Sequence, residues 1–170
     1  AAQKGIVVML APLYLGVGCG SDGWCAEVQA ASTATLTAWG QYVGNRYKNY
    51  DNVIWLIGGD TDPSSVKSRV QAVVDGIRSV DTRHPMTAHN AYDEMAITPW
   101  AGASWLSVND VYTYSLTLYQ QALTAYHVSP VLPQETKRVN ELLEKVEIMT
   151  REEPVNVANL IRTWLMEIPP

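Results

Sequence analysis

The fold is decided by one stretch of the sequence, Asn52-Val53-Ile54-Trp55-Leu56-Ile57-Gly58-Gly59-Asp60. A continuous apolar run, here Val53 to Ile57, is typical of a strand buried on both faces when turn signals bound it, as in a parallel sheet. The two glycines allow a sharp turn and a close approach by another molecule. Asp60 then stands at the carboxyl end of the strand, where α/β sheets and barrels place their chemistry. The alternative is that Asp60 only caps the following helix.

The chain up to residue 135 alternates apolar strands with amphipathic helices. We expect strands at 5–12, 53–57, 86–90 and 104–109, the start of another at 130–135, and helices at 33–48, 64–80 and 116–127. Ser32 or Thr33 is a suitable cap for the first helix. The second carries one apolar stripe, made of Val66, Val70, Val73, Val74 and Ile77. This alternation indicates βα units and a parallel sheet, so we predict an α/β fold.

Polar and aromatic residues gather just after the predicted strands. Because strand ends converge on one face of a barrel, we expect them to meet in space. They are Tyr14, Trp24, Asp60, His89, Asn90, Asn109, Tyr112 and Glu135. For His89 the alternative is a purely structural hydrogen bond.

The composition limits the classes of partner that the protein is expected to bind. A net charge of −5 argues against nucleic acid or an anionic membrane surface. No apolar run reaches the roughly 18 residues of a transmembrane helix. The 6 Trp and 9 Tyr, with no Phe, suit carbohydrate stacking and an ordinary core equally well.

Two cysteines, Cys19 and Cys25, lie in one glycine-containing loop. They are candidates for a disulfide, which would imply an oxidising compartment; the alternative is two unlinked thiols. No CxxC spacing or histidine cluster accompanies them, so we predict neither a metal site nor a cofactor.

Four segments together resemble the apiosidase-like glycoside hydrolases of the (β/α)8 clan, a family also described as collagen-binding. The segments are 5–16, 45–60, 77–89 and 105–114. The resemblance implies that residues 1–135 form a partial TIM barrel, from about strand three to strand seven. Strands one, two and eight are then absent from the chain, so we expect either that a partner chain supplies the rest of the barrel or that the segment is marginally stable by itself.

The resemblance also implies the roles of the site residues. Asp60 is the expected general acid/base, with a raised pKa, and Glu135 the expected nucleophile of a retaining glycosidase. Around them, Tyr14 or Trp24 would stack on a sugar ring. The hydrogen bonds to sugar hydroxyls would come from His89, Asn90, Asn109 and Tyr112. The expected substrate is carbohydrate, on plant or bacterial polysaccharide side chains, and the expected location is secreted or periplasmic.

Residues 136–170 are more charged and predict a helical hairpin, so we place a domain boundary at 135. This tail resembles the cytoplasmic tail of the flagellar MS-ring protein FliF, which implies a foreign segment that binds a FliG-like rotor protein in the cytoplasm. The residues expected to contact that partner are Val157, Leu160, Ile161, Trp164 and Leu165. The alternative is a native hairpin that covers the open sheet.

Overall fold

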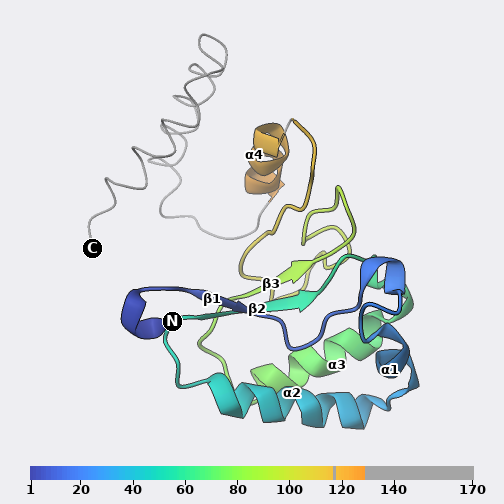
Figure 1. The fold of residues 1–170 in the computed structure, drawn as a ribbon, viewed down its shortest axis with the longest axis vertical. Coiled ribbons are helices and arrows are strands. Elements are labelled where there is room, and N and C mark those ends of the chain that lie inside the picture. Colours follow the sequence, from blue (N-terminus) through green and yellow to red (C-terminus); the bar gives the residue numbers. More distant parts are fainter. Residues whose placement is uncertain (117, 129–170) are drawn as a thin grey trace. The chain divides into compact units, whose positions relative to one another are not determined.

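The computed structural model describes residues 1–116 and 118–128. Its centre is a parallel three-stranded sheet in the order β1 (Val8–Leu10), β2 (Val53–Gly58) and β3 (Met86–His89) (Figure 1). Trp55 is paired with Leu10 on one side and Met86 on the other. Its side chain is fully buried, as the apolar run predicts.

Four α-helices belong to the described residues, namely α1 (Cys25–Ala30), α2 (Thr33–Tyr47), α3 (Lys67–Arg78) and α4 (Leu118–Val128). Short 3-10 turns occur at Ala2–Lys4, Val17–Cys19 and Pro63–Ser65. The hydroxyl of Ser32 accepts a hydrogen bond from the backbone N–H of Thr35, which confirms the predicted cap of α2. The short helix α1 has no counterpart in the sequence-based prediction.

Helices α2 and α3 pack against each other on one side of the sheet (Figure 1). Two glycines permit this close approach. A Cβ added at Gly40 would collide with the carbonyl of Val73, and one at Gly76 with the carbonyl of Thr37. The stripe predicted for the second helix is buried in full, so it forms the helical half of the core.

The segment 104–109, predicted to be a strand, is not one. Its backbone N–H groups reach β3 through one acceptor, because those of Ser107 and Val108 both donate to the carbonyl of Met86. A side chain makes a further bond between the two segments, from the Thr87 hydroxyl to the Val108 carbonyl. The apolar pattern here comes from Trp105 and Leu106, which are buried in the core without belonging to the sheet.

A polar cluster lies inside the core beneath β2. Asp81 accepts hydrogen bonds from the indole N–H of Trp55, at 2.9 Å, and from the backbone N–H of His84. Burial would raise the pKa of Asp81, but its hydrogen bonds with His84 and Trp55 lower it below its usual value. The ring of His84 is itself buried, between Asp81 and the carbonyl of Tyr50.

Several predictions fall on residues that the structure does not describe, namely the strand at 130–135, Glu135, the domain boundary and the helical tail. Within the described residues, no helix is long and apolar enough to span a bilayer. Two hollows of about 250 and 380 Å³ lie beside Asn52 and Val53, at the start of β2. They are therefore at the opposite end of the strand from Asp60.

Candidate active site

Asp60 stands directly after β2 in an unusual backbone conformation. Gly58, Gly59 and Asp60 have consecutive positive φ values of 89°, 141° and 45°. A Cβ at Gly59 would run into the ring of Tyr14, so the glycine lets this ring approach the turn. Asp60 itself adopts the left-handed region, which non-glycine residues enter mainly at functional sites and turns. The sharp turn expected of the glycine pair is confirmed, while the close approach seen here is made by Tyr14 of the same chain and the expected approach of another molecule stays a prediction.

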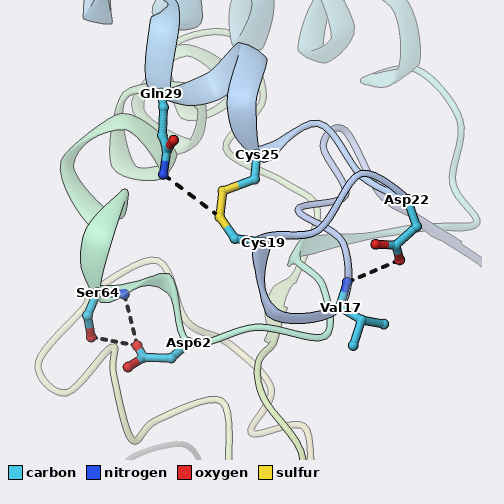
Figure 2. Close-up of a disulfide and its surroundings, with 7 residues drawn as sticks. All are labelled: Val17, Cys19, Asp22, Cys25, Gln29, Asp62 and Ser64. Carbon is cyan, nitrogen blue, oxygen red and sulfur yellow. Dashed lines mark hydrogen bonds between the residues drawn. A yellow bond between two sulfur atoms is a disulfide. The ribbon is translucent and has the colours of Figure 1, made fainter.

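The helix-cap alternative for Asp60 is wrong, because Asp62 fills that role. The Asp62 carboxylate accepts hydrogen bonds from the backbone N–H and the hydroxyl of Ser64 (Figure 2). The carboxylate of Asp60 is thus available for other contacts, and its side chain is 24% exposed.

Tyr14 supplies the shortest contact to Asp60. Its hydroxyl lies 2.7 Å from Asp60 Oδ2 and 3.3 Å from Asp22 Oδ2. A phenol has one proton to donate, so the shorter distance indicates that it is directed at Asp60. The hydroxyl therefore points its proton at the carboxylate, whereas the sequence predicted a stacking role for this ring.

His89, at the end of β3, lies between two carboxylates. Its Nε2 is 3.1 Å from Asp60 Oδ1 and its Nδ1 is 3.0 Å from Asp110 Oδ2. The ring of Tyr112 covers that of His89, with centroids 4.4 Å apart. Three residues that the sequence predicted to meet, Asp60, His89 and Tyr112, are therefore in one place.

The hydrogen bonds set the charge state of the site. The hydrogen bond from Tyr14 lowers the pKa of Asp60, opposed by partial burial and reinforced by His89. The same bond raises the pKa of Tyr14 to about 12. The raised pKa expected for Asp60 is thus wrong, because its donors stabilise the ionised carboxylate more than burial destabilises it.

The loop that carries the cysteines forms one wall of this site. Cys19 and Cys25 are joined in a disulfide with their Cα atoms 5.2 Å apart (Figure 2). Within the loop, the backbone N–H of Val17 donates to Asp22, and the N–H of Gly18 donates to the carbonyl of Asp60. The disulfide loop thereby fixes the positions of the Asp22 carboxylate and the Asp60 backbone relative to each other.

Asn90 and Asn109 take other positions than a sugar-binding role predicts, whereas the stacking role of Trp24 stays a prediction. Trp24 is 62% exposed, and its backbone N–H donates to the carbonyl of Tyr14. Asn90 is only 2% exposed, with its amide bonded to the carbonyls of Met95 and Ala96. This position corrects the prediction for Asn90, because a side chain that is almost fully buried, with its amide turned into its own loop, is not open to a ligand.

Asn109 joins two segments. Its carbonyl accepts from the N–H of Ile97, and its amide donates to the carbonyl of Ala125 in α4. Its prediction as a sugar-binding residue is corrected in the same way, since both ends of the amide are engaged with backbone.

Sequence reasoning missed four residues at the site, namely Asp22, Tyr92, Asp110 and Tyr114. Asp110 is adjacent to the predicted Asn109, and Asp22 lies inside the cysteine loop, so both stand next to recognised signals. Within the described part of the chain, no group of three or more His, Cys, Asp or Glu side chains is placed to hold a metal ion. The chemistry on view is that of carboxylates, an imidazole and phenols, which suits proton transfer.

Solved structures with similar folds are glycoside hydrolases. One, the crystal structure of a glycoside hydrolase family 5 protein from Bacteroides vulgatus ATCC 8482, is 27% identical with a TM-score of 0.54. That match covers 64% of this chain and 22% of the other. Another, described as a glycoside hydrolase, has a TM-score of 0.61 at 21% identity and covers 78% of this chain and 32% of the other. The chain thus spans a third or less of the length of each.

These matches indicate a TIM-barrel-like α/β fold, of which the described sheet holds three parallel strands. The second match, below 25% identity, bears on the fold alone. No curated protein sequence matches the chain.

The family model for the apiosidase-like catalytic domain matches residues 1–159. The match continues past the boundary predicted at residue 135, and neither structure named above is a flagellar protein. The resemblance of the tail to FliF therefore finds no support, while the boundary itself stays a prediction. Since the match spans most of the chain, the chain belongs to the apiosidase-like catalytic domain family.

Proposed function

We propose that this chain is part of a glycoside hydrolase that cleaves O-glycosidic bonds in carbohydrate with retention of configuration. The observation that carries the proposal is the placement of Asp60. It stands at the carboxyl end of a parallel strand, partly open to solvent, with Tyr14 and His89 bonded to its two oxygens. Family membership supports the same reaction class.

In this mechanism Asp60 gives a proton to the leaving oxygen while a second carboxylate attacks the anomeric carbon. The glycosidic bond breaks, and a covalent glycosyl–enzyme ester forms. Asp60, now ionised, then takes a proton from water as that water attacks the same carbon and releases the enzyme carboxylate. We assign the second carboxylate to Glu135, which lies outside the described residues but inside the family match.

The geometry around His89 supports this role, because both ring nitrogens of His89 face carboxylates. An N–H at Nε2 can donate to the ionised form of Asp60, and a bare Nε2 can accept from the protonated form. The contact is therefore compatible with both forms that a general acid/base passes through, and Asp110 holds the other ring nitrogen.

The substrate we propose is a side chain of a plant or bacterial polysaccharide, with Tyr112 and Trp24 at its edges. An extracellular or periplasmic location follows from the same proposal. The disulfide of Cys19 and Cys25 supports it, because such bonds persist in oxidising compartments.

The test is hydrolysis of a panel of aryl glycosides by the chain and by Asp60→Asn. We expect kcat/KM to fall by about 10²- to 10⁴-fold in Asp60→Asn, the usual worth of general acid–base catalysis. The loss should be larger for a poor leaving group such as phenol than for dinitrophenol, since dinitrophenolate leaves without a proton.

Two further measurements sharpen the result. Azide should restore turnover of the dinitrophenyl glycoside by Asp60→Asn, because azide attacks the glycosyl–enzyme without a general base. Glu135→Gln should stay inactive with azide if Glu135 forms that intermediate. Equal rates for the original chain and Asp60→Asn would remove Asp60 from the reaction.

A further inference from the structure

Three tyrosines form a cluster beside the candidate active site. Tyr92 and Tyr114 are stacked, with ring centroids 5.4 Å apart and an interplanar angle of 21°. Tyr112 packs edge-on against both, and its hydroxyl lies 2.6 Å from that of Tyr114. Tyr92 is 50% exposed and Tyr114 is 76% exposed.

The backbone beneath the cluster is tied together, so the rings do not meet by chance. The segments 91–97 and 109–115 run antiparallel, joined by a bridge between Met95 and Val111. The N–H of Asp93 donates to the carbonyl of Tyr112, and the carboxylate of Asp93 accepts from the hydroxyl of Thr113. Asp93 itself has a φ of 63°. These contacts fix the two loops that carry Tyr92 and Tyr114.

The arrangement leaves one ring face open and rigidly held. Tyr92 covers one face of the Tyr114 ring, and the Tyr112 hydroxyl fixes its far end. The high exposure of Tyr114 therefore belongs to its other face. A ring that is already ordered loses little conformational freedom when a ligand covers it, which favours binding.

The cluster is continuous with the catalytic groups. Tyr112 covers the ring of His89, which contacts Asp60. Tyr114 is the next side chain outward from Tyr112. A group bound on Tyr114 is thus separated from Asp60 by the rings of Tyr112 and His89.

We propose that the open face of Tyr114 is a carbohydrate subsite, which stacks on a sugar unit of the same substrate outward from the one that is cleaved. The C–H face of a sugar ring matches the aromatic face, while its hydroxyls remain free to bond the phenol groups and water. This proposal rests on the proposed function, since it names a second contact for the same substrate.

The test uses the chain of residues 1–170, labelled and applied to an array of defined plant and bacterial oligosaccharides. The proteins compared are Asp60→Asn, which prevents turnover, and the same protein with Tyr114→Ala, Tyr114→Phe or Tyr119→Ala. Tyr119 is an exposed tyrosine of α4 and serves as the matched control. We expect Tyr114→Ala to weaken binding by about three- to tenfold, the range of one aromatic contact. Tyr114→Phe keeps the ring and should retain most of the binding, and Tyr119→Ala should retain all of it.

The proposal is overturned if Tyr114→Ala binds as well as its parent, or if no oligosaccharide binds the parent. If Tyr114→Ala loses binding to a tetramethylammonium probe but keeps its saccharide binding, the open face is a cation site. That result would also overturn the proposal. Thermal melting of each variant distinguishes these results from misfolding. The aryl-glycoside assay tests the reaction separately. Hydrolysis that depends on Asp60, together with unchanged oligosaccharide binding by Tyr114→Ala, would contradict only the subsite. Oligosaccharide binding that depends on Tyr114, with no hydrolysis, would contradict only the proposed reaction.

Discussion

The carboxylate of Asp60 is positioned by residues from three separate parts of the sequence. Gly59 makes room for Tyr14, Tyr14 donates to one oxygen, and His89 lies against the other. Tyr14 also touches Asp22, so its hydroxyl is held between two acidic groups. The Tyr14 hydroxyl therefore has the largest influence on the position and the proton affinity of the Asp60 carboxylate. A substitution of Tyr14 is the most direct test of this arrangement.

We predict that Tyr14→Phe moves the alkaline limb of the kcat/KM–pH profile to higher pH. The Tyr14 hydroxyl is the largest cause of the lowered pKa of Asp60, because it stabilises the ionised form. Its removal raises the pKa of Asp60, so the acid keeps its proton to a higher pH. Rates measured across the pH range with one aryl glycoside give the shift.

A suitable control for this experiment is Tyr42→Phe, an exposed tyrosine on α2 that is stacked on Trp39. Its profile should coincide with that of the original chain. An alkaline limb that stays in place or moves to lower pH in Tyr14→Phe would contradict the assignment of Tyr14 as the group that governs Asp60.

The importance of Asp60 was predictable because its signals are local: an apolar strand, two glycines and an acid. The contacts of Asp22 and Asp110 were not, since each depends on how a loop folds back onto the strand end. Asn90 shows the opposite error. It follows β3 just as His89 does, but successive residues point in different directions, so only His89 reaches the site.

At the scale of elements, α2 and α3 were predictable from periodicity and capping. The Ser32 cap and the stripe of the second helix both act within a few residues, so tertiary packing only had to agree with them. Helix α1 was missed because its six residues are too few to show a period. The apolar pattern of residues 104–109 resembles that of a strand, but it reflects only the burial of Trp105 and Leu106 in the core.

The disulfide loop should contribute measurably to stability. Replacing Cys19 and Cys25 together by Ser frees a small loop in the unfolded chain, which lowers the free energy of unfolding by about 2 kcal/mol in the loop-entropy model. Since Gly18 of this loop donates to the carbonyl of Asp60, activity should fall as well. Urea unfolding of the two proteins gives the difference.

Reducing agent provides an internal comparison. It should lower the stability of the original chain to that of the Cys19→Ser/Cys25→Ser variant and leave the variant unchanged. A variant as stable as the original chain, in both urea and activity assays, would show that the loop is held by its hydrogen bonds alone.

For the whole molecule, β1 is the feature with the largest consequence. Within the described sheet it pairs with β2 on one side only, so it is an edge strand. Met9 of this strand and the preceding Val7 expose apolar side chains to solvent, at 52% and 58% exposure. Exposed, apolar edge strands readily pair with other chains. The structural relatives are longer, since this chain spans a third or less of each.

We therefore predict that the chain of residues 1–170 self-associates as its concentration rises, and that Met9→Lys suppresses this. A lysine in the exposed apolar row disfavours burial against a second edge without changing the pairing of β1 with β2. Light scattering over a concentration series measures the effect. Ala38→Lys, at an exposed site on α2, adds the same charge away from the edge and should leave association intact. Equal suppression of association by both variants would assign the effect to net charge. A chain that stays monomeric at every concentration would show that β1 does not pair with a second chain.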